Sequence, residues 1–206
     1  EYGTLKDSKG NLVTNASGFS VGGSNIDVFL GFAQDGINTS KSFKQQADKL
    51  YGLGAEGITF GVLLVQSDQG SFTAMKAHAN TIAIYGFDPN DFQLSVNGVD
   101  FEVNMGKSQN DPALDFVASF GPGGYAVPTG AAPVMLDMTN YRILASVQNA
   151  TLRISQFVFL SGSFKFQKGD DVRLSVVGPL GLRVDNVLAS SMTFGATNVQ
   201  AFVGAN

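Results

Sequence analysis

The chain has 206 residues, of which 44% are hydrophobic and 15% charged, and it contains 25 glycines and 17 phenylalanines but no cysteine. This balance excludes a disordered acidic or basic segment. The formal net charge of −4, with 13 scattered Lys and Arg residues, argues against nucleic acid as a partner. No apolar run approaches the roughly 20 residues of a membrane-spanning helix.

The first half of the chain predicts one short helix followed by two strands. Apolar residues at three- to four-residue spacing favour a helix over residues 42–53, ended by Gly52 and Gly54. Residues 57–66 and 72–87 are expected to be strands of a second sheet, which covers the apolar face of the sheet formed by the second half. Loops are expected at residues 6–11, 34–40, 107–112 and 121–133.

In the second half, apolar residues lie symmetrically about pairs of turn-forming residues, as they do in hairpins. Asn97-Gly98 is the strongest of these signals, because both positions tolerate positive φ, and it would set Val96 opposite Val99. Four more such centres predict an antiparallel meander from about residue 134 to 176, with one apolar and one polar face. They are Thr139-Asn140, Asn149-Ala150, Ser161-Gly162 and Lys168-Gly169-Asp170, with a bulge near Ser155-Gln156.

The two ends of the chain share a sequence repeat. Residues 22–31 recur as residues 195–204, at an offset of 173 residues. Gly22, Asn25, Phe29 and Gly31 have identical partners, and three further positions, with Ser/Thr, Ile/Val and Leu/Val, replace like with like. A unit whose end repeats its beginning is typical of a piece cut from a tandem array. We therefore expect about one 173-residue period plus the start of the next.

These patterns together predict one all-β module spanning residues 1–206. Its antiparallel meander would form a sandwich-like or rolled, elongated sheet, with at most one short helix. Phe29 and Phe202 mark the ends of the module, where neighbouring copies are expected to meet.

Several segments resemble units of very large, repetitive bacterial proteins of the cell-surface or secreted type. The segments are residues 53–61 (LGAEGITFG), 71–77 (SFTAMKA), 124–130 (GYAVPTG), 159–166 (FLSGSFKF) and 195–204 (GATNVQAFVG). Such proteins are adhesin-like and are catalogued beside haemolysin-type calcium-binding proteins. The resemblance covers about residues 12–206 and implies an extracellular or cell-surface protein whose copies bury faces against their neighbours. It implies no catalytic residues.

The sequence offers little support for an enzyme. The single histidine, His78, is in phase with Lys76 and Asn80 on the polar side of a strand, which is typical of an exposed side chain. Asp100 and Glu102 share the polar face of another strand, as on any solvated sheet surface. We therefore predict that the protein is not an enzyme.

Calcium is the one cofactor that the sequence leaves open. Calcium requires several oxygen ligands on loops, and acidic turns supply candidates for them. The candidate ligands are Asp88, Asn90, Asp91, Asp111, Asp170 and Asp171. None of these turns has the spacing of a known calcium loop, and turn formation alone also accounts for Asp and Asn at these positions.

Three functions remain as hypotheses. The first is a structural or adhesive repeat unit of a long extracellular array, which stacks on neighbouring copies of itself. The second is a β-sandwich module that binds a surface glycan or a protein. The third is a virion-type assembly protein, which would form closed symmetric oligomers instead of linear arrays.

Overall fold

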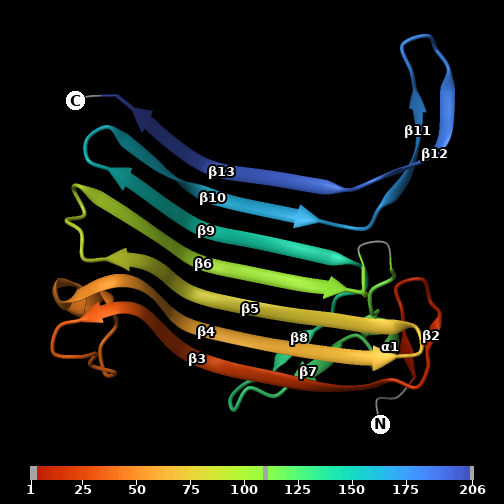
Figure 1. Ribbon diagram of the computed structural model, residues 1–206, viewed down its shortest axis with the longest axis horizontal. Helices are drawn as coiled ribbons and strands as arrows, with labels where there is room; N and C mark the ends of the chain where they lie inside the picture. Colours follow the sequence, from red (N-terminus) through yellow and green to blue (C-terminus); the bar gives the residue numbers. More distant parts are fainter. Residues whose placement is uncertain (1–3, 109–110, 205–206) are drawn as a thin grey trace.

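The computed structural model describes residues 4–108 and 111–204, and its main feature is one antiparallel sheet of seven strands (Figure 1). From edge to edge the order is β13-β10-β9-β6-β5-β4-β3. The strands are β3 (Ser17–Ala33), β4 (Leu50–Ser67), β5 (Gly70–Tyr85), β6 (Phe92–Met105), β9 (Arg142–Ile154), β10 (Val158–Lys168) and β13 (Met192–Val203). The prediction of an all-β fold is confirmed.

The remaining elements are short and lie around this sheet. Three two-stranded pairs are β1 (Leu5–Lys6) with β2 (Leu12–Val13), β7 (Tyr125–Val127) with β8 (Val134–Leu136), and β11 (Val172–Val177) with β12 (Arg183–Ala189). The helical turns are the 3₁₀ turn η1 (Lys44–Lys49) and α1 (Phe116–Phe120). In Figure 1, β7, β8 and α1 lie behind the sheet, whereas the β11–β12 hairpin projects away from it. In the described part of the chain, no helix has the length and apolar character needed to cross a membrane.

The main core lies between the sheet and these small elements. Leu63 and Val65 of β4 are buried, and they alternate with the half-buried Val62 and Leu64, because successive side chains of a strand point to opposite faces. The side chains that cover them include Val127 and Leu136 of the β7–β8 pair, Leu5 of β1 and Phe116 of α1. A smaller cluster of Phe43, Leu50, Ala83 and Tyr85 lies at the other end of the sheet, beside η1.

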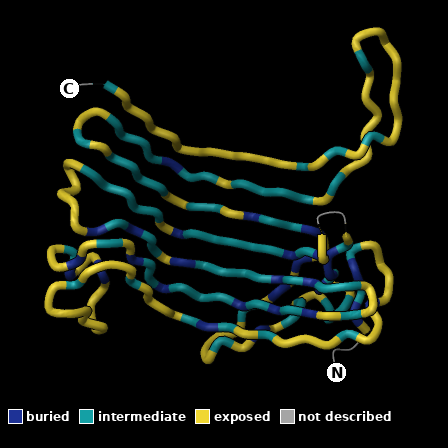
Figure 2. The backbone as a smooth tube through the Cα atoms, viewed as in Figure 1, coloured by how far each residue is buried: buried dark blue, intermediate teal, exposed yellow. Residues whose placement is uncertain are grey.

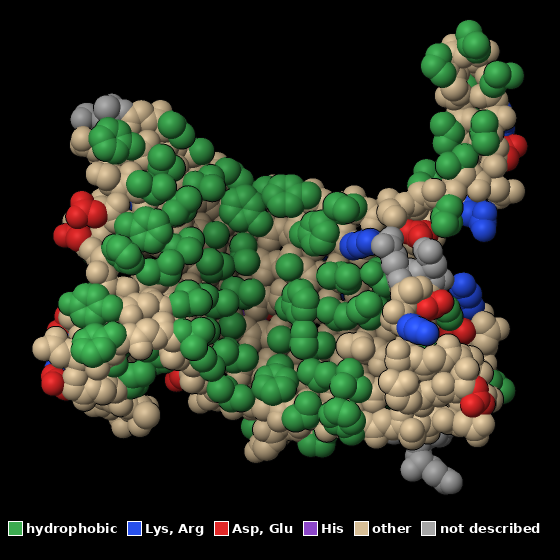
Figure 3. Space-filling model, in the orientation of Figure 1, with side chains coloured by type: hydrophobic (Ala, Val, Ile, Leu, Met, Phe, Trp, Pro, Cys, Tyr) green, Lys and Arg blue, Asp and Glu red, His purple; other side chains and the backbone are tan. Residues whose placement is uncertain are grey.

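The other face of the sheet is apolar and largely uncovered. Figure 3 shows hydrophobic side chains over much of the face turned to the viewer, and Figure 2 shows only scattered buried positions along the strands there. Successive strand partners across the sheet form apolar rows on it. One such row is Phe60, Ala77, Phe101, Ala145, Phe166 and Phe194. Phe194, on the edge strand, is 69% exposed.

Three of the predicted hairpins are wrong, because the chain runs straight through their turns. Asn97-Gly98 lies inside β6, Asn149-Ala150 inside β9 and Ser161-Gly162 inside β10. At Gly98, φ is +59°, and the strands bend in their middle (Figure 1). A bend shifts the apolar alternation by one residue, which produces the same symmetric sequence pattern as a hairpin. The sequence pattern alone therefore could not separate the two.

The other predicted elements are partly corrected. Residues 57–66 and 72–87 do form strands, but β4 and β5 belong to the same sheet as β6 and β9, so the second sheet expected for a sandwich is absent from the described residues. The predicted helix over 42–53 is reduced to η1, and its last residues belong to β4. Gly52 and the following Gly54 disfavour continuation of a helix, and the chain is already extended from Leu50.

The predicted connections also differ. Ser155-Gln156 is the turn between β9 and β10, with φ of +50° at Ser155, and not a bulge within a strand. The segments at Thr139-Asn140 and Lys168-Gly169-Asp170 are loops, but β8 pairs with β7 and β11 with β12, so neither loop closes the hairpin expected there. β10 pairs with β9 on one side, and its partner on the other side is the distant β13.

Candidate functional site

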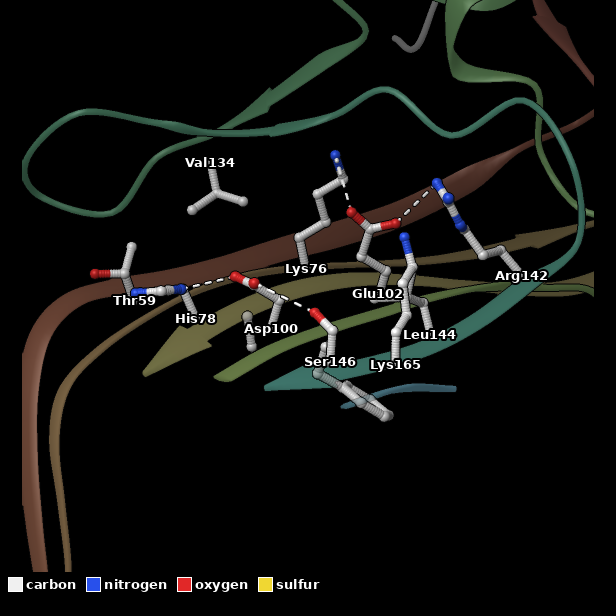
Figure 4. A pocket seen from close by; sticks show the side chains of 12 residues that line it. Thr59, Lys76, His78, Asp100, Glu102, Val134, Arg142, Leu144, Ser146 and Lys165 are labelled. Atoms are coloured by element: carbon white, nitrogen blue, oxygen red, sulfur yellow. Dashed lines mark hydrogen bonds and ion pairs between the residues drawn. The ribbon is translucent and has the colours of Figure 1, made fainter. Parts of the chain in front are cut away.

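A polar pocket of about 360 Å³ lies on the covered face of the sheet, under the β7–β8 pair (Figure 4). Its floor consists of two neighbouring rows of strand partners, which belong to β4, β5, β6, β9 and β10. One row carries Thr59, His78, Asp100, Ser146 and Lys165, and the next carries Gly61, Lys76, Glu102 and Leu144. Val134 of β8 lies above them. The period of two along each strand therefore places these charges together.

The charged groups in the second row form a chain of ion pairs. Lys76 Nζ lies 2.5 Å from Asp137 Oδ1 and 3.6 Å from Glu102 Oε1. Glu102 Oε2 lies 2.9 Å from Arg142 Nη1. The side chains of Lys76 and Glu102 are only 23% and 21% exposed, so these ion pairs are less screened by water than ordinary surface pairs.

The first row holds the histidine and the serine. His78 Nδ1 lies 2.7 Å from Asp100 Oδ1, and its Nε2 lies 3.2 Å from Asn80 Oδ1. Ser146 Oγ donates to Asp100 Oδ2 at 3.4 Å and not to the histidine. A serine nucleophile needs a base in contact with its hydroxyl, and in this pocket the carboxylate stands between the two groups. The geometry is that of a charge-paired sheet surface.

Three of the predicted calcium ligands come together and three lie elsewhere. Asp111, Asp170 and Asp171 line one pocket together with Lys9 and Arg173. Asp88, Asn90 and Asp91 form the turn between β5 and β6, where Asp88 Oδ1 accepts from the Asn90 backbone N–H at 2.8 Å.

The pocket that holds Asp170 has an unusual electrostatic environment. Burial raises the pKa of Asp170 above its ordinary value, against the opposing effect of a backbone hydrogen bond from Tyr141. Asp111 Oδ2 accepts from both the backbone N–H and the hydroxyl of Ser108 at 2.8 Å. Across residues 4–108 and 111–204, no three acidic, His or Cys side chains are close enough together to form a metal site. Calcium binding stays a prediction.

The two copies of the sequence repeat lie on the two opposite edges of the sheet. Residues 22–31 belong to β3, at one edge, and residues 195–204 include most of β13, at the other (Figure 1). The two strands share a local distortion. Asn25 and Asn198, which are equivalent in the repeat, both have φ of +54°, and the pairing of each strand with its neighbour shifts there.

The predicted interface residues lie on these edges in different surroundings. The Phe29 ring lies 5.5 Å from the Phe43 ring and 6.5 Å from the Tyr85 ring, between centroids. Phe202 pairs with Phe159 of β10 and is 43% exposed. The sequence identified the two repeated segments but not their position at the edges of one sheet. It missed the ion pairs of Lys76, Glu102 and Arg142, because these depend on a strand order that no sequence pattern specified.

Comparison with known proteins finds no match among protein-family models, curated proteins or solved structures. The resemblance to repetitive bacterial surface proteins therefore stays a prediction. The chain is therefore an all-β protein built on one broad sheet. The two edge strands of this sheet, β3 and β13, contain the repeated segments.

Proposed function

We propose that this chain is a structural, adhesive repeat unit of a long extracellular or cell-surface array, in which neighbouring copies associate through the edges of their sheets. The observation that supports it is the equivalence of β3 and β13, which share sequence, the positive φ at Asn25 and Asn198, and a position at an edge. Because the repeated segment forms both edge strands, the strands of a neighbouring copy can be added at an edge and extend the same sheet.

The edge formed by β13 has properties that favour association. Proteins that exist alone usually protect an open sheet edge with charges, prolines or covering loops. The twelve residues of β13 are all exposed and include no charged residue and no proline. Its large apolar side chains include Met192, Phe194, Val199, Phe202 and Val203, with exposed fractions from 43% to 81%. Such an edge gains both backbone hydrogen bonds and apolar burial when a partner covers it.

The proposal is tested with two complete chains joined by a flexible Gly/Ser linker, compared with the single chain. Small-angle scattering is expected to give a rigid rod for the joined pair, and its melting temperature is expected to exceed that of the single chain, because stacking buries surface at the junction. Two independently tumbling bodies with the melting temperature of the single chain would overturn the proposal.

A second candidate function, a module that binds a glycan or a protein, is favoured by the pocket around Lys76 and Glu102. Ligand pockets combine apolar walls with a few convergent polar groups, and this pocket has both. A screen of glycans against the single chain and its Glu102→Gln variant separates this function from the first. The binding function would be favoured if the single chain binds a glycan, if Glu102→Gln abolishes this binding, and if two joined copies do not stack. A closed, symmetric oligomer would instead favour the virion-type alternative.

A further inference from the structure

We propose that in the array the free edge of β13 pairs with β4 of the following copy and takes the place of that copy's β3, so that one strand serves both as the last strand of one copy and as the β3 of the next. This inference rests on the proposed function and specifies its contact. The partner is identified by the repeat: β4 is the strand that pairs with β3, and residues 195–204, which include most of β13, repeat residues 22–31 of β3 with four identical positions.

The glycines of the repeat carry the argument. A side chain at Gly22 would place its Cβ 2.5 Å from the carbonyl oxygen of Pro128 and 3.0 Å from that of Phe60, so glycine is required there. Gly195 is the equivalent residue, yet no heavy atom except those of its chain neighbours lies within 4 Å of its Cβ position in the described part of the chain. No described residue of a single copy therefore explains a glycine at 195. A second copy seated as proposed brings its own Pro128 and Phe60 against it.

A second glycine pair behaves in the same way. The Cβ of a residue at Gly31 would lie 2.2 Å from the backbone oxygen of Tyr51, whereas the nearest atom at the equivalent Gly204 belongs to the Phe202 ring, 3.4 Å away. The repeat replaces Gly23, which meets mainly side chains, with Ala196. Within residues 22–31, glycine is thus retained where backbone atoms block the Cβ position, and replaced where only side chains do.

The segments that precede the two edge strands lead to the same conclusion. The β1–β2 hairpin before β3 is packed, with Leu5 and Val13 buried in the main core. The β11–β12 hairpin before β13 is exposed, and Leu180 and Leu182 are 88% and 70% accessible. If β13 acts as a β3, the β11–β12 hairpin lies beside the second copy, where that copy's own β1–β2 hairpin would lie.

The pairing of β3 with β4 predicts the register of the contact. Val28 pairs with Ala55 and Phe29 with Gly54, so Ala201 of one copy pairs with Ala55 of the next, and Phe202 lies over its Gly54. Phe43, whose ring covers Gly54, then packs on Phe202 as it packs on Phe29. The predicted pairing begins at Met192, because Ser191 replaces Gly18, whose Cβ position is blocked by the Leu64 oxygen.

The test is a fusion in which residues 34–206 follow residue 206 of the full chain directly. Its second copy has no β1, β2 or β3 of its own and must use the β13 of the first. We expect the second copy to fold and to resist protease as the first does. The chain has no cysteine, so Ala201→Cys in the first copy with Ala55→Cys in the second is expected to form a disulfide. The pair Ala201→Cys with Leu53→Cys is two residues out of register and is expected not to.

The substitution Gly195→Val is made both in the single chain and in the first copy of the fusion, so that its effect on folding is separated from its effect on the contact. We expect no change in the melting temperature of the single chain, because the space at Gly195 is open, and loss of the protease-resistant second copy in the fusion. A second copy that is digested while the first stays intact, or a Gly195→Val change without effect in the fusion, would overturn the shared strand. If two complete linked copies still form a rod in that case, the array proposal stands and only the shared strand fails.

Discussion

Phe29 and Phe202 occupy equivalent positions of one repeated sequence, but among the described residues only the Phe29 ring packs against other aromatic rings, those of Phe43 and Tyr85. Phe202 is 43% exposed at the opposite edge of the sheet. The same residue in the same local backbone thus has two environments. The difference arises because the chain supplies β4 and η1 beside one edge only.

Substitution of each phenylalanine by alanine measures that difference in the single chain. Phe29→Ala is expected to lower the free energy of unfolding by about 2–3 kcal/mol, less than for a fully buried phenylalanine, and Phe202→Ala by less than about 1 kcal/mol. Urea denaturation at one protein concentration gives both values. Equal losses would show that the two edges are equally packed and would contradict the structure.

Asn104 should be the most sensitive polar position. Its side chain is fully buried, and its amide Nδ2 donates to the carbonyl oxygens of Leu114 at 2.7 Å and Asn140 at 3.0 Å. Asn104→Leu leaves both carbonyls without this donor and is expected to lower the free energy of unfolding by about 2–4 kcal/mol. Thr81→Val, at a partly exposed strand position with one side-chain hydrogen bond to Asn97, is the control and is expected to cost less than about 1 kcal/mol. Comparable losses in the two variants would contradict this assignment.

Glu102 is expected to hold the polar pocket together. Glu102→Gln leaves Lys76 and Arg142 near one another without their shared carboxylate, and the free energy of unfolding should fall by about 1–2 kcal/mol. Asp35→Asn removes a well-exposed ion pair with Lys49 and should cost less than about 0.5 kcal/mol. Denaturation in low and high salt checks both values, and a loss at Asp35 as large as at Glu102 would contradict the prediction.

Asp170 is expected to make stability depend on pH. Because burial raises its pKa in the folded chain above the ordinary 3.8, the folded state favours the protonated form. The stability that this supplies is complete below about pH 3.8 and is lost as the pH rises through the folded pKa. Asp170→Asn should therefore be more stable than the natural chain at pH 7, and the two should converge in acid.

Asp185 provides a control of opposite sign. A hydrogen bond from Ser175, and then one from Arg183, lower the pKa of its carboxyl, so its contribution is present above its ordinary pKa and is lost as the pH falls. Asp185→Asn should be slightly less stable than the natural chain at pH 7. Thermal melts between pH 3 and 8 check both variants. A gain of stability in Asp185→Asn, or a loss in Asp170→Asn, would contradict the expected direction of the two pKa shifts.

Calcium binding is a prediction from the sequence, and its test is the pocket lined by Asp111, Asp170 and Asp171, although their carboxylates are not close enough together to form a ready metal site. Lys9 and Arg173 share the pocket, so the affinity should be weak, with a Kd on the order of 10⁻⁴–10⁻³ M. About 10 mM calcium should raise the melting temperature, and Asp171→Asn should abolish the rise, whereas Asp88→Asn should not. An equal rise of the melting temperature with magnesium, or no rise with calcium, would contradict a calcium site. The acidic residues would then be explained by turn formation alone.

The sequence predicted the class of the fold and the position of many polar residues. Alternation alone placed Asp100 and Glu102 on one face and Val99 and Phe101 on the other, and the structure agrees. Strand alternation is a local property, since it follows from the geometry of the extended backbone. For the same reason strands were found at 57–66 and 72–87, with three of the four ends within two residues of β4 and β5, whereas β4 begins seven residues earlier, at Leu50.

The order of the strands in the sheet could not be predicted from the sequence. A bend at Asn97-Gly98 and a hairpin at the same place predict the same symmetric pattern of apolar residues, and only the pairing of β6 with both β5 and β9 distinguishes them. The strands are therefore longer and the turns fewer than expected, and of the two expected forms, a sandwich or one elongated sheet, the structure has one broad sheet. The ion pairs of Glu102 depend on this order and were therefore missed.

By itself, the sequence determined that the chain is all-β and that its two ends repeat each other, because both properties follow from residue types and their spacing along the chain. Only the tertiary structure decided that the two copies become the opposite edges of one sheet, β3 and β13. The physical reason is that a sheet edge is defined by which strand lacks a neighbour. That depends on backbone hydrogen bonds between segments far apart in the chain, which no local pattern specifies.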